Sequence, residues 1–99
     1  MIDIKICKAG NTLSFCAIGH ADHAPYGYDI VCAGVSGLVI GLSSALDSDN
    51  IHTDISSGRA VIRSKNTRDA RCCFRLVQKA LELIAAEYPE NIKLTADLI

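Results

Sequence analysis

Two short stretches near the start of the chain alternate between apolar and polar side chains. Residues 2–7 and 12–17 carry an apolar side chain at every second position, as in Ile-Asp-Ile-Lys-Ile and Leu-Ser-Phe-Cys-Ala. A period of two predicts a strand with one buried face, so we expect both stretches in a sheet. Residues 8–11, Lys-Ala-Gly-Asn, contain two turn formers and predict the hairpin that joins the strands.

The pattern changes between Asp29 and Asp47, where residues 30–46 carry no charge. The run contains glycines and serines and falls short of the roughly 20 apolar residues that cross a bilayer, so it predicts a buried helix. Asp29 is a suitable N-cap, and the backbone N–H of Cys32 is its expected donor. Each glycine costs a helix about 1 kcal/mol relative to alanine. We therefore expect a sheet or a partner helix to pack tightly along the glycine face.

The second half repeats the order of hairpin and helix. Residues 51–55 and 60–62 predict two strands, and the turn sequence Ser-Ser-Gly-Arg at 56–59 joins them. Thr67 is the expected N-cap of a second helix, which has apolar side chains at helical spacing up to Tyr88.

Pro89 ends this helix, and residues 92–97 alternate once more as a final strand. The resulting order is ββαββαβ. It predicts one α+β domain over residues 1–99, in which two helices pack on a mostly antiparallel sheet.

The amino-acid composition and net charge limit the classes of protein to which this chain can belong. The chain is 49% hydrophobic and 21% charged, with a net charge of −1, which is ordinary for a folded soluble domain and disfavours direct nucleic-acid binding. The alternating N-terminus does not resemble an export signal. The five cysteines have no CxxC spacing, which suits free thiols in a reducing compartment, so we expect a cytoplasmic protein that neither spans nor binds a membrane.

The strongest chemical candidate is Cys32, in the first turn of the first predicted helix. Unpaired N–H groups and partial positive charge at a helix start favour thiolate over thiol. A histidine from the preceding strand end or loop can take the thiol proton and return it to a leaving group. This arrangement predicts a cysteine hydrolase. The alternative is that Cys32 is simply a small buried hydrophobe.

The neighbouring candidates stay open on spacing alone. His20 follows Gly19 at a strand end and His23 lies in the loop over residues 21–28, so either ring can reach the helix start. Asp29 opposes a thiolate unless its charge is directed elsewhere, so we assign it to capping or histidine orientation. Ser36 lies one turn after Cys32 and either donates to the thiolate or substrate or bonds back to its own helix.

A zinc site is a weaker reading of the same residues. His20, His23 and Cys32 offer three ligands, and Asp22 or Asp29 would have to supply the fourth. The spacing is not that of a standard zinc finger. The sequence also lacks a glycine-rich phosphate loop with a lysine. We expect neither a metal nor a cofactor.

The motif around these residues adds a family resemblance. Gly19-His20-Ala21, followed by residues 26–36 with the sequence Tyr-Gly-Tyr-Asp-Ile-Val-Cys-Ala-Gly-Val-Ser, closely resembles the ribosomal-processing cysteine protease family, Prp. The likeness extends over the whole chain in length and element order. It implies that Cys32 is the nucleophile and His20 the general base and acid. Asp29 and Ser36 match motif positions of less certain role.

The resemblance also implies a substrate and an assembly. The expected substrate is the short N-terminal extension of a large-subunit ribosomal protein, and the expected assembly is a homodimer. The loop that carries His23 and Tyr26 is expected to be mobile and to close over the extension. The alternative function is a non-catalytic, ribosome-associated module that uses the same pocket to hold an extended peptide.

Overall fold

The computed structural model describes residues 1–22, 24–25, 29–46 and 49–96. Its elements follow the expected order ββαββαβ. They are β1 (Ile2–Ala9), β2 (Thr12–Gly19), α1 (Ile30–Ala45), β3 (Ile51–Ser56), β4 (Arg59–Lys65), α2 (Arg68–Glu87) and β5 (Ile92–Ala96).

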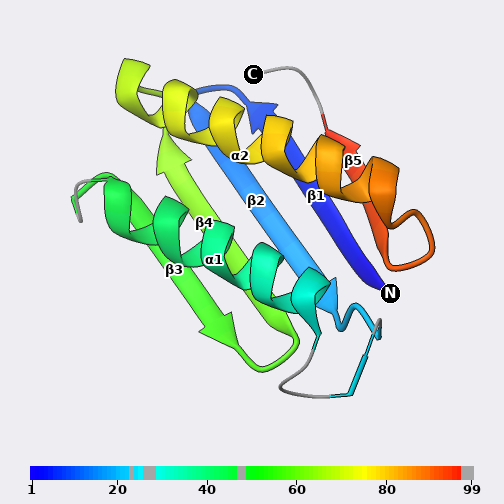
Figure 1. Ribbon diagram of the computed structural model, residues 1–99. Coiled ribbons are helices and arrows are strands. Elements are labelled where there is room, and N and C mark those ends of the chain that lie inside the picture. Colours follow the sequence, from blue (N-terminus) through cyan, green and yellow to red (C-terminus); the bar gives the residue numbers. More distant parts are fainter. Residues whose placement is uncertain (23, 26–28, 47–48, 97–99) are drawn as a thin grey trace.

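The strands form one sheet in the order β3-β4-β2-β1-β5. Three neighbouring pairs are antiparallel, and β5 pairs with β1 in parallel. Both helices lie on one face of this sheet, with α1 over the β3–β4 side and α2 over the β1–β2 side (Figure 1). The predicted α+β fold with a mostly antiparallel sheet is confirmed.

Both hairpins close through two-residue turns. Ala9 pairs with Thr12 across the first turn, and Ser56 pairs with Arg59 across the second. Each turn contains one glycine with positive φ. Gly10, the first residue of the β1–β2 turn, has φ +59°, and Gly58, the second residue of the β3–β4 turn, has φ +71°. Positive φ at these sites is the reason both predicted turns contain glycine.

The core lies between the sheet and the helices. Every second side chain is buried from Ile2 to Ile6 in β1 and from Leu13 to Ala17 in β2, as the period of two predicts. From the helix layer, α2 contributes the larger apolar face, whereas α1 contributes mainly valines. The largest fully buried side chains are Phe15, Phe74, Ile4, Ile6, Leu13, Leu42, Ile62, Leu81 and Val31.

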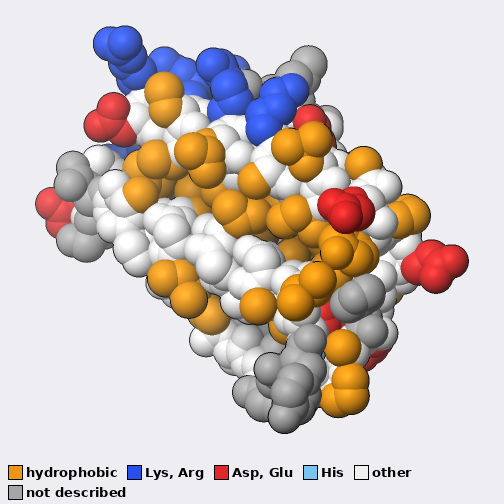
Figure 2. Space-filling model, viewed as in Figure 1, with side chains coloured by type: hydrophobic (Ala, Val, Ile, Leu, Met, Phe, Trp, Pro, Cys, Tyr) orange, Lys and Arg blue, Asp and Glu red, His pale blue; other side chains and the backbone are white. Residues whose placement is uncertain are grey.

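The uncharged run forms α1, but its glycine face is not tightly packed. A Cβ at Gly34 would make ordinary contact with Ile84 Cδ1 at 3.7 Å, while a Cβ at Gly37 or Gly41 would have nothing within 4 Å. No described residue of the same chain therefore packs closely against Gly37 or Gly41, and the prediction of a partner helix at these positions is not tested by a single chain. Figure 2 shows the surface over α1 without acidic or basic side chains, whereas Lys and Arg gather near α2. Neither helix in the described part of the chain is long and apolar enough to cross a membrane.

Two substitutions on α2 test which face carries the core. Phe74 is fully buried and Leu83 is 74% exposed. Phe74→Ala should lower the free energy of unfolding by about 3–5 kcal/mol, because it removes buried area and leaves a cavity. Leu83→Ala should change it by less than about 0.5 kcal/mol. Urea denaturation followed by circular dichroism measures both, and equal losses would contradict the packing described here.

Candidate active site

The first part of the site is the end of β2. Gly19 has φ +104°, and a Cβ there would collide with the carbonyl oxygen of Met1. Its N–H donates to the carbonyl oxygen of Gly58 at 2.8 Å, which ties the strand end to the β3–β4 turn. Only glycine fits this backbone, and the chain turns here to present His20.

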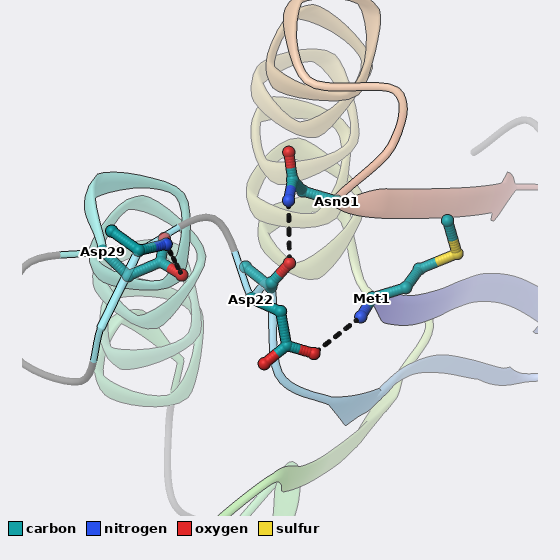
Figure 3. Close-up of polar contacts among 6 residues, drawn as sticks. Met1, Asp22, Asp29 and Asn91 are labelled. Carbon is teal, nitrogen blue, oxygen red and sulfur yellow. Dashed lines mark hydrogen bonds and ion pairs between the residues drawn. The ribbon is translucent and has the colours of Figure 1, made fainter.

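The residues after His20 are held by contacts to both the first strand's start and the segment before β5. The side-chain amide of Asn91 donates to the Ala21 carbonyl oxygen at 2.9 Å, and the Met1 amino group lies 3.3 Å from the Asp22 carboxylate (Figure 3). Ala21 is buried, whereas Asp22 is exposed and has a left-handed φ of +56°. These contacts fix the path of the chain as it leaves His20.

The second part of the site is the start of α1. Asp29 Oδ1 accepts from the Cys32 N–H at 3.0 Å, as the N-cap prediction requires (Figure 3). Asp29 Oδ2 accepts from the Ala24 N–H at 3.3 Å. The carboxylate thus caps the helix and ties the preceding loop to it. Its negative charge is directed at backbone donors, an arrangement that limits its opposition to a thiolate at Cys32.

These two parts meet around a cavity of about 470 Å³, whose walls include the predicted site residues His20, Asp29, Cys32 and Ser36. Cys32 is half-buried, while His20 and Ser36 are exposed. No hydrogen bond joins the thiol to the imidazole in the described part of the chain. Catalytic hydrogen bonds are often long without substrate and shorten when it binds. His23 and Tyr26 lie outside the described residues.

A second cavity of about 320 Å³ adjoins the first and shares His20, Cys32 and Ser36 with it. Apolar side chains of α1, among them Val35 and Val39, face Ile55 and Gly58 of the β3–β4 hairpin across this space. Sequence reasoning missed this wall of the site, because the approach of the second hairpin to α1 is a long-range feature with no local signal.

The remaining ligand-type side chains are dispersed. All five cysteines are free, as predicted, and the Cys7 thiol lies 2.8 Å from the Ser14 hydroxyl on β2. In the ranges that the structure describes, no group of three His, Cys, Asp or Glu side chains is placed to hold a metal ion. The zinc interpretation included His23, which is outside those ranges.

Comparison with known proteins identifies the family to which this chain belongs. The sequence profile described as "Cysteine protease Prp" matches residues 1–93. The chain belongs to the Prp family of cysteine proteases. Two curated relatives from Staphylococcus aureus strains, each named ribosomal processing cysteine protease Prp, are 35% identical over 100 aligned positions that cover 94% of either chain.

Solved Prp structures share the fold. The crystal structure of an essential Prp from S. aureus with a covalently linked product peptide is similar with a TM-score of 0.85 and 33% identity, covering 98% of this chain and all of the other. The S. aureus Prp in complex with a substrate peptide gives a TM-score of 0.75 over 97% of each chain, again at 33% identity. The match to Prp confirms the prediction of a cysteine protease.

The two helix caps offer a test of what Asp29 does in this protease. Asp29 caps α1, and Thr67 caps α2 by accepting from the Ala70 N–H at 3.1 Å. Loss of either cap, in Asp29→Ala or Thr67→Ala, should cost about 1 kcal/mol of stability. Only Asp29→Ala should also lower peptide cleavage, by at least about tenfold, because only that cap orients the turn containing Cys32.

Asp29→Asn separates the effect of the helix cap from that of the negative charge of the carboxylate, because asparagine caps a helix about as well as aspartate. It should retain the stability and most of the cleavage rate. Urea denaturation and a peptide cleavage assay measure the two effects. If Thr67→Ala reduced cleavage as much as Asp29→Ala, the loss would reflect general destabilisation and not the turn at Cys32.

Proposed function

We propose that this protein is an endopeptidase of ribosome maturation, which removes a short N-terminal extension from a large-subunit ribosomal protein. Cys32 is the nucleophile and His20 the general base and acid. The observation that carries the proposal is that both side chains line one cavity at the start of α1, although they come from different elements. The names of the S. aureus relatives and their peptide complexes support the substrate class.

The proposed reaction has two steps. The Cys32 sulfur attacks the scissile carbonyl carbon, the peptide C–N bond breaks, and His20 gives its proton to the leaving amine. The result is a thioester between Cys32 and the acyl part of the substrate. His20 then takes a proton from water, the hydroxide attacks the thioester, and the Cys32 thiolate leaves as the free acid product forms.

The oxyanion of each step requires hydrogen-bond donors that are not already engaged. Asp29 occupies two of the N–H groups in this turn: its carboxylate accepts from Cys32 N–H and its carbonyl oxygen accepts from Ala33 N–H at 3.0 Å. The N–H groups of Cys32 and Ala33 are therefore already engaged in this state. We assign the stabilisation of the oxyanion to the first-turn N–H groups of Ile30 and Val31, which precede Cys32.

The other motif residues have supporting roles in this proposal. Ser36 is exposed on the walls of both cavities, so its hydroxyl is placed to donate to a bound peptide. The apolar second cavity beside Cys32 suits an apolar side chain of that peptide. We assign His23 and Tyr26, which lie outside the described residues, to substrate binding. Five free thiols suit the reducing cytoplasm, where ribosomes are assembled.

We further propose that two copies associate through the outer face of α1. This helix contains no charged residue, and Ile30 and Ile40 are 62% and 64% exposed on it. Gly37 and Gly41 have open space where a Cβ would lie, so a second helix can approach their backbone closely. A pairing of identical surfaces would bury this uncharged face.

The cleavage assay uses a peptide that spans the ribosomal-protein extension and its junction, with products identified by mass. Wild-type protein should cut once. Cys32→Ala should abolish cleavage while retaining peptide binding, and His20→Ala should reduce the rate by about 10²–10⁴-fold through loss of proton transfer. Cys72→Ala is the matched control, because it removes an exposed thiol on α2 away from the site.

Binding without cleavage by the wild type would instead identify a peptide-holding module. Residual cleavage by pure Cys32→Ala protein would disprove the nucleophile assignment. If His23→Ala abolished cleavage and His20→Ala did not, the general base would be His23.

Gly41→Glu tests the pairing of α1. Glutamate favours a helix more than glycine does by roughly 1 kcal/mol, so the protomer should remain folded, while two like charges would meet in the paired face. Sedimentation velocity should show a dimer for wild type and a monomer for Gly41→Glu. Leu83→Glu, at the exposed position on α2, is the control that should stay dimeric. A monomeric wild type would disprove the proposed pairing.

A further inference from the structure

Each hairpin turn of this fold contains one glycine with positive φ, at the first turn position in β1–β2 and at the second in β3–β4, and the two glycines differ in surroundings. Gly10 lies in the β1–β2 turn with φ +59°, and Gly58 lies in the β3–β4 turn with φ +71°. An L-residue with a side chain is disfavoured at either position, because positive φ crowds its Cβ. The backbone conformation alone therefore favours glycine at both positions.

The space beside the two glycines is different. A Cβ at Gly10 would have nothing within 4 Å, whereas a Cβ at Gly58 would lie 2.9 Å from Nε2 of His20, 3.4 Å from Cε1 and 3.7 Å from Cδ2. The outer edge of the imidazole therefore rests against the bare backbone of Gly58. The His20 ring could not keep its present position beside any other residue.

The same turn also holds the backbone that carries this ring. Gly58 accepts, through its carbonyl oxygen, the hydrogen bond from Gly19 N–H at 2.8 Å. The strand pairing continues this contact, since Ile18 pairs with Arg59. One residue thus fixes the main chain just before His20 and forms the wall against which the imidazole lies.

We propose that Gly58 is a positioning residue for His20. It acts through the imidazole and contacts no reacting atom, and the assignment rests on the proposed role of His20 as general base and acid. His20 is an exposed side chain that can swing away from an added Cβ at little cost to the fold. The same movement carries the ring nitrogens away from the cavity that His20 shares with Cys32, where small displacements strongly slow proton transfer.

Gly58→Ala and Gly10→Ala form a matched pair for the test. Both introduce one methyl group at a turn position with positive φ, so both should lower the urea midpoint. Gly58→Ala should reduce kcat for peptide cleavage at least tenfold, whereas KM should change much less, because the added methyl group alters only one edge of the second cavity that Gly58 lines. Gly10→Ala should leave both kinetic constants within twofold.

A spectroscopic measurement reports on the contact without requiring activity. The imidazole Cε1–H signal of His20 can be assigned by its loss in His20→Ala. It should move in Gly58→Ala and keep its wild-type position in Gly10→Ala. If the alanine variants fold poorly, Gly58→Asn and Gly10→Asn repeat the comparison, because asparagine adopts positive φ more readily.

The outcomes separate this inference from the proposed function. Equal kcat for the Gly58 and Gly10 variants, with His20→Ala inactive, would overturn the role of Gly58 alone. Full activity of His20→Ala would overturn the proposed dyad, and the positioning role with it. An unchanged His20 signal in Gly58→Ala would show that the contact does not hold the ring and would also overturn the inference.

Discussion

The structure depends on the burial of one face of a five-stranded sheet beneath two helices. Fully buried side chains from β1, β2 and α2, among them Ile4, Phe15 and Phe74, meet in this layer. Their burial fixes the strand register, since a slip by one residue would turn every apolar side chain toward solvent. The register in turn determines where β2 ends, and His20 directly follows that end. The position of the histidine is thus a consequence of core packing.

The electrostatic arrangement at the other half of the site depends on a single carboxylate. Asp29 places negative charge at a helix start, where the helix dipole favours it, and both of its oxygens accept from backbone N–H groups. The cost is that the N–H of Cys32 is engaged. The Cys32 N–H thus orders the turn that contains the Cys32 sulfur, whereas at many helix N-termini such N–H groups bind the ligand.

Local features of this fold could be predicted from the sequence. The period of two gave the strands, Asp29 and Thr67 gave both helix starts, and the glycines at positions 10 and 58 marked the turns. The motif residues His20 and Cys32 were likewise recognisable. Contacts between distant segments could not be predicted, because no short-range pattern encodes them. The Asn91–Ala21 hydrogen bond and the approach of Gly58 to His20 depend on how the hairpins and the last strand are arranged in the sheet.

The parallel pairing of β5 with β1 has a consequence for synthesis of the chain. Ile92 pairs with Ile2, and Asn91 beside it holds the carbonyl group that follows His20. Both contacts join residues from opposite ends of the sequence, so neither can form until the final strand has emerged from the ribosome. During translation, the backbone that follows His20 therefore lacks this anchor until residues 91–96 have been made.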